Sequence, residues 1–325
     1  MIRGIVFFIA LSAAFPFSAS GQSKVTFPIS ASSKTLGYSP PWIALKQGFF
    51  AQQGLDVQLV LVRGADTSTQ ALISGSTYLA AGAADVPILA IERGMDLVII
   101  GGVINGLTHA IMGGKKYRTY EELRGTVLGS QSLTSGITFA LRRVLKAKGL
   151  QYPKDYQILS VGGTPDAFAA LAAGQIAAAP LALPLNFAAE ELGFHTIGWY
   201  REVLPNYQLT TLTVRRSWAV KNRPLLVRFM MAMAQANRWL YGNKEAAVNF
   251  LVKEMKLKPD HARKGWEYYT ENRVWHPDAD VNIEGIKTVG SIYADEGQIK
   301  DPRPEKYLDQ SYLREALEKL GSAQK

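Results

Sequence analysis

Two stretches of the chain, ninety-nine residues apart, carry the same pattern of apolar and polar positions. In each, a glycine begins a helix rich in alanine and leucine, the helix ends at Ser-Gly or Ala-Gly, and a strand of small apolar residues follows. The first stretch runs from Gly64 to Pro87 and the second from Gly163 to Pro184. Two similar units in one chain predict two similar lobes, and a ligand held between them would be contacted by equivalent loops. This pattern favours capture over catalysis.

Apolar runs of strand length alternate with helical patterns from Val25 to about Gly198, which is typical of βαβ units and a mostly parallel sheet. Besides the two repeats, strands are expected at 25–30, 57–62, 97–103, 127–129, 156–161 and 209–214. Helices are expected from Pro40 to Gly48, over 86–93 and over 137–148, because proline favours a helix start and glycine a helix end. From Ser217 onward the pattern is almost wholly helical, with segments at 223–241, 244–255, 259–272, 282–295 and 311–320.

Turn residues mark a change in the pattern between residues 101 and 114. Gly101-Gly102, Asn105-Gly106 and Gly113-Gly114 surround a short extended piece, Thr108 to Met112, which we interpret as the first crossing between lobes. The β-rich segment 209–214 supplies the return strand, and the helical tail then wraps back onto the first lobe. The predicted organisation is a signal peptide at 1–21, a discontinuous lobe one at 22–107 and 213–325, and lobe two at 108–212.

The first twenty-one residues have the composition of a secretory signal peptide. Arg3 precedes the apolar run Ile5 to Leu11, which is too short to span a bilayer, and small residues follow at 18–21. The chain contains no cysteine, which removes disulfides, thiolate metal sites and cysteine nucleophiles. Export without cysteine indicates a periplasmic protein, and about 300 mature residues favour two lobes over one core.

The formal net charge is +9. The basic residues are scattered in short clusters, with no Lys/Arg tract of the kind that follows a phosphate backbone, so nucleic acid is not an expected partner. A basic surface would attract a small anion. The alternative is a generally basic secreted protein whose charges are simply solvated.

Several segments together resemble the nitrate, sulfonate, taurine and thiamine-precursor family of periplasmic solute-binding proteins, which serve ABC importers. These segments, in the order and spacing of the family, are GFFAQQGLDVQLV (48–60), ALISGS (71–76), AIERGMDLVIIG (90–101), Leu-Arg-Gly (123–125) and ALAAGQIAAAP (170–180). The resemblance implies an α/β fold of the type II periplasmic binding-protein kind, with two Rossmann-like lobes joined by two crossing strands. It also implies a protein that closes on one small molecule and delivers it to a membrane permease. A monomer without a cofactor is expected.

Ligands of open parallel α/β lobes bind beyond the carboxyl ends of the strands, and the resemblance places the cleft at the same loops. The loop at 130–136 is the best candidate, because its hydroxyls precede a helix whose free N–H groups favour an anion; ordinary helix capping is the alternative. Aromatic rings could wall or cover the ligand, and the acids and the amide could hydrogen-bond it, with capping and core packing as the alternatives. The candidate ligand-binding residues are Ser39, Trp42, Asp66, Asp85, Ser132, Thr134, Ser135, Thr164, Pro184, Asn186, Trp199 and Tyr207.

Catalytic and metal-binding patterns are scarce. The four histidines show no metal-ligand spacing, and neither a GxSxG elbow nor a phosphate-binding loop is present, so no catalytic or metal residue is assigned. Within the same family, a thiamine-pyrimidine synthase shares the fold, but it is linked to a Cys-rich iron motif and to intracellular work. A third possibility is a periplasmic sensor that works with a receptor. The ligand is expected to be an organic anion such as a sulfonate or aromatic carboxylate, or a molecule with an apolar body; amines, pyrimidines and peptides stay open.

Overall fold

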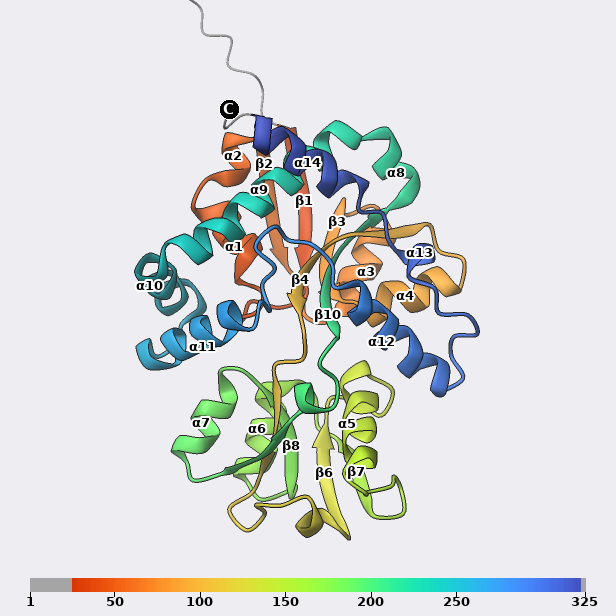
Figure 1. The fold of residues 1–325 in the computed structure, drawn as a ribbon, viewed down its shortest axis with the longest axis vertical. Helices are drawn as coiled ribbons and strands as arrows, with labels where there is room; N and C mark the ends of the chain where they lie inside the picture. Colours follow the sequence, from red (N-terminus) through yellow and green to blue (C-terminus); the bar gives the residue numbers. More distant parts are fainter. Residues whose placement is uncertain (1–24, 323–325) are drawn as a thin grey trace, which may run out of the picture.

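The computed structural model describes residues 25–322, so the predicted signal peptide at 1–21 lies outside the described residues. The described chain forms two five-stranded sheets, one above the other in Figure 1. The first sheet has the strand order β2-β1-β3-β10-β4 and the second the order β7-β6-β8-β5-β9. We call each sheet with its covering helices a lobe. The two-lobed α/β fold predicted from the sequence is confirmed.

The strands of the two sheets occupy equivalent places. The first sheet contains β1 (Val25–Ala31), β2 (Leu55–Leu61), β3 (Leu79–Ala83), β4 (Leu97–Asn105) and β10 (Gln208–Arg215). The second contains β5 (His109–Gly113), β6 (Thr126–Ser130), β7 (Tyr156–Ser160), β8 (Ala178–Ala182) and β9 (His195–Trp199). In the first sheet β1 is parallel to β2 and β3, and β10 runs antiparallel to β3 and β4. In the second, β6 is parallel to β7 and β8, and β5 runs antiparallel to β8 and β9.

The sequence repeat corresponds to one helix and one strand in each lobe. Helix α3 (Ala65–Ile73) and strand β3 are followed, ninety-nine residues later at every bound, by α6 (Thr164–Ala172) and β8. Gly75 and Gly174 follow the two helices with φ of +82° and +70°, a left-handed conformation that glycine adopts without a Cβ penalty. The shared Gly is therefore a local requirement of the helix-to-strand turn in both lobes.

The chain crosses between the lobes twice. The first crossing joins β4 to β5, and the second follows β9 and leads into β10 (Figure 1). All of β10 pairs with the first sheet, from Gln208 opposite Asn105 to Arg215 opposite Leu97. The predicted boundary at 212/213 falls inside this strand, so the return to the first sheet begins at Gln208. Local sequence shows that a return strand exists, but only its pairing partners show where it joins the sheet.

Helices cover both sheets and the junction between them. Before β10 the helices are α1 (Ser39–Lys46), α2 (Phe49–Gln52), α3, α4 (Asp85–Glu92), η1 (Glu121–Leu123), α5 (Gly136–Ala147), α6, α7 (Leu185–Glu191) and η2 (Tyr200–Glu202). After β10 they are α8 (Arg216–Lys221), α9 (Arg223–Gly242), α10 (Lys244–Met255), α11 (Pro259–Glu271), α12 (Ile283–Asp295), α13 (Pro304–Tyr307) and α14 (Ser311–Ser322). No helix of the described chain is both long and apolar enough to cross a membrane.

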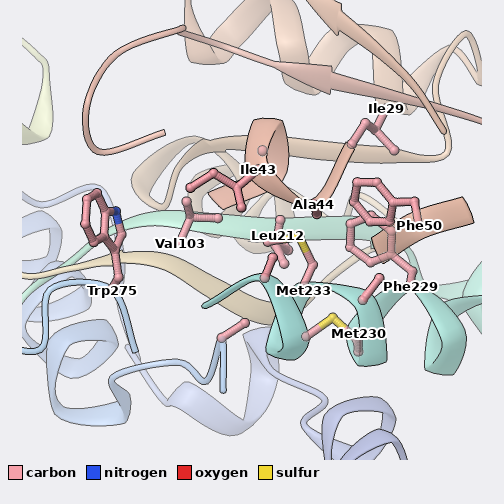
Figure 2. Close-up of a cluster of buried hydrophobic side chains, with 14 of the residues drawn as sticks. Ile29, Ile43, Ala44, Phe50, Val103, Leu212, Phe229, Met230, Met233 and Trp275 are labelled. Carbon is pink, nitrogen blue, oxygen red and sulfur yellow. The ribbon is translucent and has the colours of Figure 1, made fainter. Parts of the chain in front are cut away.

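The core of the first lobe contains segments from the N-terminal and C-terminal halves of the chain. Helix α9 packs its apolar face against the strands and helices of the N-terminal segment, as Figure 2 shows. The Phe229 ring stacks on Phe50, with 5.2 Å between ring centroids, and lies 5.4 Å from Phe27. All three rings are buried. The predicted docking of the helical tail on the first lobe is confirmed, and this aromatic contact is part of its basis.

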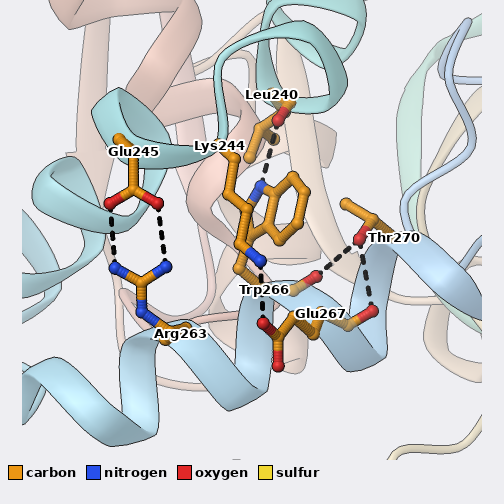
Figure 3. A network of polar contacts seen from close by, with 7 residues as sticks. All are labelled: Leu240, Lys244, Glu245, Arg263, Trp266, Glu267 and Thr270. Atoms are coloured by element: carbon orange, nitrogen blue, oxygen red, sulfur yellow. Dashed lines mark hydrogen bonds and ion pairs between the residues drawn. The ribbon is translucent and has the colours of Figure 1, made fainter.

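Helices α10 and α11 form a hairpin held by polar contacts (Figure 3). Arg263 forms a bidentate ion pair with Glu245, with both N–O distances at 2.8 Å. The indole N–H of Trp266 donates to the Leu240 carbonyl at 3.0 Å, which ties α11 to the end of α9. Because α11 also contacts the second lobe, this hairpin fixes one side of the junction between the lobes.

Replacing Phe229 with alanine should lower the free energy of unfolding by about 3–5 kcal/mol, because it removes a buried ring and leaves a cavity beside Phe27 and Phe50. Urea unfolding followed by circular dichroism would measure the change. The control is Val220→Ala, since Val220 is 69% exposed and its loss should change stability by less than about 0.5 kcal/mol. Equal effects of the two substitutions would show that the tail is not docked as described.

Candidate functional site

The two lobes meet where helices α4 and α5 begin. Asp85 is the first residue of α4 and follows β3, and Gly136 is the first residue of α5 and follows β6 through the loop at 131–135. The Gly136 N–H donates a hydrogen bond to Asp85 Oδ2 at 3.1 Å. The carboxyl ends of two parallel strands, one from each sheet, are thus brought to one place, as expected for a ligand site in open α/β lobes.

The Asp85 carboxylate has a second partner on a distant helix. The Tyr293 hydroxyl, on α12, donates to the same oxygen at 2.6 Å. Burial, and then the neighbouring Asp85 charge, raise the pKa of Tyr293 far above its usual value, so its proton stays on oxygen and serves the hydrogen bond. Burial and Asp85 likewise raise the pKa of the candidate Tyr207. Asp85 therefore lies among neutral hydroxyl groups.

Gly136 is needed for this close approach. A Cβ at this position would lie 2.8 Å from the Tyr207 hydroxyl and 2.9 Å from Asp85 Oδ2, both closer than real Cβ contacts. The glycine thus lets the start of α5 approach the opposite lobe directly.

The candidate loop before α5 is largely committed to capping the helix. The Ser135 hydroxyl accepts from the Thr138 N–H at 3.3 Å, which is a standard N-cap contact. The carbonyl of Ser132 accepts from the Thr138 hydroxyl at 2.5 Å. Thr134 is exposed and Ser132 is half-buried. The structure thus gives the Ser135 hydroxyl a capping role and leaves those of Ser132 and Thr134 at the edge of the junction.

Three of the other candidates are placed in the first lobe or on its surface. Ser39 begins α1 and is fully buried, and Trp42 lies one turn later and is half-buried. The Lys34 ammonium lies 4.6 Å from the Trp42 ring centroid and 3.6 Å from a carboxylate oxygen of Glu254. Asp66 is exposed in the first turn of α3. Of these, Ser39 and Trp42 have the burial expected of a binding wall.

The remaining candidates belong to the second lobe or its connections. Thr164 begins α6, and Pro184 precedes α7, in whose first turn Asn186 is fully buried. Trp199 ends β9 and stacks on Tyr268 of α11, with 5.5 Å between ring centroids. Trp199 therefore packs across the junction between the lobes, against the α11 helix.

Several of these buried side chains have polar atoms without a hydrogen-bond partner within residues 25–322. They are Ser39 Oγ, Trp42 Nε1 and both amide atoms of Asn186. A buried polar group left unpaired costs about 1–3 kcal/mol, so native structures keep few of them. Three of the twelve candidate residues carry such atoms, from both lobes. A solute that supplies the missing partners would recover this cost.

His109 was missed as a candidate, although the structure places it among them. It begins β5 and pairs with Ala182 at the end of β8. Its ring stacks on the Tyr200 ring, with 5.7 Å between the two ring centroids. Its Nδ1 also has no partner within the described residues. Burial lowers the pKa of His109 to about 4, so the ring is neutral at neutral pH. The local sequence gave no signal for His109, because its pairing with β8 joins residues far apart in the chain.

A small cavity of about 20 Å³ lies beside His109, and it has room for about one water molecule. Its lining comes from His109, Ser130, Gln131, Ile137, Gly162, Thr164, Ala167 and Pro180. A larger hollow of about 520 Å³ lies at the start of β4, and none of the candidate residues lines it. Of the twelve candidate residues, Thr164 lines the small cavity, together with the added His109.

The lobes contact each other on both sides of the site. On one side Glu191 of α7 binds His261 and Lys258 at 2.7 and 2.6 Å. On the other, Arg142 of α5 binds Glu296, beside α12, at 3.0 Å. Hydrogen bonds from Lys258 and His261 lower the pKa of Glu191 and keep it ionised. No group of three or more His, Cys, Asp or Glu side chains suited to a metal ion occurs within residues 25–322.

This arrangement of two sheets, two crossings and a junction built from strand ends is that of a periplasmic binding protein, and known proteins agree. The model of the NMT1-like family matches residues 31–252, well over half of the chain, so the chain belongs to this family. The "Putative binding protein YtlA" of Bacillus subtilis (strain 168) is 21% identical over 292 residues, which cover 88% of this chain and 86% of YtlA.

Two solved structures share the fold. The ligand binding component of an ABC-type import system from Staphylococcus aureus, solved with zinc bound, has a TM-score of 0.75 at 15% identity and covers 90% of this chain and 98% of its own. The periplasmic aliphatic sulphonate binding protein SsuA from Escherichia coli has a TM-score of 0.70 at 18% identity and covers 88% of this chain and 92% of its own. The predicted resemblance to ABC-importer solute-binding proteins is thereby confirmed for family and fold.

The low pKa of His109 predicts a loss of stability in acid. Because the unfolded chain binds a proton at a higher pH than the folded chain, stability should fall as the pH drops from about 6.5 to about 4, by about 3 kcal/mol at most. The His109→Gln variant should lack this component. Urea unfolding at a series of pH values would measure it, with His195→Gln as control, since His195 is half-buried. A parallel pH dependence in all three proteins would contradict the buried, neutral ring.

Proposed function

We propose that the protein is the solute-binding component of an ABC importer, which captures a small organic molecule between its lobes and delivers it to a permease in the inner membrane. The observation that carries the proposal is the set of unpaired buried polar atoms on Ser39, Trp42, His109 and Asn186. They come from both lobes: Ser39 and Trp42 lie on α1 of the first, and His109 and Asn186 lie on β5 and α7 of the second. Such an arrangement suits a ligand that bridges the lobes.

The mechanism is rotation of one lobe against the other about the two crossings. Ligand contacts from both lobes stabilise the closed arrangement, and the permease recognises that arrangement. The contacts at the sides of the junction are mostly ion pairs between partly exposed groups, and such pairs contribute little to stability. Breaking these ion pairs as the lobes open therefore costs little free energy. The contacts of the ligand then decide whether the open or the closed arrangement is more stable.

The proposed contacts divide between the lobes. Ser39 and Trp42 contribute from the first lobe, Thr164, Pro184, Asn186 and the added His109 from the second, and Asp85 lies between them. Ser132, Thr134, Asp66, Trp199 and Tyr207 are proposed as further contacts, and Ser135 supports the start of α5 as a helix cap. The protein is proposed to act as a periplasmic monomer without a cofactor.

Capture without turnover is favoured over an enzyme. The thiamine-pyrimidine synthase alternative needs a Cys-rich iron motif, and the chain has no cysteine. The named relatives are described as binding proteins.

Native mass spectrometry of the purified protein tests the proposal. A small molecule should co-purify at one per chain, and adding it back after removal should raise the melting temperature without changing it chemically. At a ligand concentration of 100 times Kd, the added stability is about 2.7 kcal/mol. Conversion of the bound molecule into a product would contradict capture.

The Asn186→Leu variant should separate binding from folding. Leucine has a similar volume and removes both unpaired amide atoms, so the free protein should become more stable, by about 1–3 kcal/mol. Affinity for the co-purified molecule should fall at least about tenfold, since two hydrogen bonds are lost. Calorimetry and urea unfolding measure the two effects. Asn249→Leu, at an exposed position of α10, is the control and should change neither. Unchanged affinity in Asn186→Leu would remove this residue from the site.

A further inference from the structure

The start of α5 is the place where the sequence predicts an anion, and the structure shows a carboxylate already there. α5 is twelve residues long, and its first N–H, on Gly136, donates to Asp85 of the opposite lobe. Ser135 takes the Thr138 N–H. A helix N-terminus favours one negative group, and here the protein supplies that group itself.

Asp85 is held where it is by a separate contact. Tyr293 on α12 donates to the same Oδ2 atom at 2.6 Å, so the carboxylate would stay beside the site if the bond to Gly136 were broken. Asp85 is half-buried, and Oδ1 accepts no hydrogen bond from residues 25–322. One carboxylate oxygen is therefore left for a donor from outside the chain.

The charges around Asp85 do not favour a bound anion. The two acids among the candidate residues are Asp66 and Asp85, and none of the candidates is Lys or Arg. His109 is neutral at neutral pH. Lys34, beside Trp42, is paired with Glu254, and Arg142 of α5 is paired with Glu296. An anion placed at the start of α5 would face the Asp85 charge at close range, where the repulsion is about 1–4 kcal/mol.

We infer that Asp85 determines the ligand class: it keeps the start of α5 closed to anions and selects a neutral or cationic ligand that brings an N–H donor to the carboxylate. The inference rests on the proposed function. A carboxylate, sulfonate or nitrate group at this point is disfavoured by the Asp85 charge. An amine, an amidine or a nitrogen heterocycle with a ring or exocyclic N–H fits, because each can donate to Oδ1.

The test uses sulfate as a probe and does not require the natural ligand. Wild type and Asp85→Ala are titrated with sodium sulfate against sodium chloride of equal ionic strength, and the melting temperature is followed. Wild type should show no saturable rise beyond the chloride control. Asp85→Ala frees the Gly136 N–H and removes the charge, so it should bind sulfate at least about tenfold more tightly than wild type. Equal responses in the two proteins would overturn the inference.

Matched variants separate the role of Asp85 from general effects of charge and folding. Asp56→Ala removes an exposed acid on β2, outside the candidate residues, and should respond to sulfate as wild type does. Asp85→Asn keeps the size of the side chain and an acceptor oxygen, so it tests the charge alone if Asp85→Ala unfolds. Its affinity for sulfate should lie between those of wild type and Asp85→Ala. A response of Asp56→Ala equal to that of Asp85→Ala would show a general charge effect and overturn the inference.

A second arm compares two compounds with the same ring, benzylamine and benzenesulfonate. A saturable rise with benzylamine that Asp85→Ala abolishes supports the inference. If wild type binds benzenesulfonate as tightly as Asp85→Ala does, the inference is overturned, although solute capture is supported. Absence of any co-purified molecule argues against the proposed function, and the difference in sulfate response between wild type and Asp85→Ala would still stand.

Discussion

The pairing of β10 with both β3 and β4 is the constraint on which the rest of the structure depends. It places a strand from the C-terminal half of the chain inside a sheet built from the N-terminal half. The chain must therefore leave the first lobe after β4 and come back before Gln208. From this follow the two crossings, the insertion of the second lobe, and the docking of α9 on the first sheet. The aromatic contact of Phe229 with Phe27 and Phe50 then stabilises the packing of α9 on this sheet.

The repeated helix–strand unit gives the two lobes similar scaffolds but different chemistry at their ends. Asp85 and Pro184 stand at equivalent places after β3 and β8. One supplies a carboxylate that crosses to the opposite lobe, and the other has no hydrogen-bond donor and no charge. Thus the symmetry belongs to the backbone, whose helix and strand bounds coincide in the two copies, whereas the side chains that follow the two strands differ.

Unpaired polar atoms inside a protein lower its stability and contribute nothing to folding. Asn186 is fully buried with neither amide atom bonded within the described chain, and His109 is buried as a neutral ring. A binding protein can retain such groups because the ligand completes their hydrogen bonds, and the recovered free energy then contributes to affinity and selectivity.

The sequence alone determined the elements that depend on neighbours along the chain. Helix 137–148 and helix 244–255 were predicted within a residue or two of α5 and α10, because periodicity, proline and glycine act locally. The repeat and the family motifs were also visible there, and with them the two-lobed fold. Short elements such as α7 and β9 were missed, because a few residues carry too little periodicity.

Only the tertiary structure decided how the candidate side chains are used. In the sequence, Ser135 could be either a ligand-binding hydroxyl or a helix cap. Its hydrogen bond from the Thr138 N–H shows that it caps α5. Asp85 meets Gly136 across 51 positions of sequence and Tyr293 across 208. His109 became a candidate through the strand that pairs with it. These outcomes depend on contacts between residues far apart in the chain, and the packing of the whole fold sets their geometry.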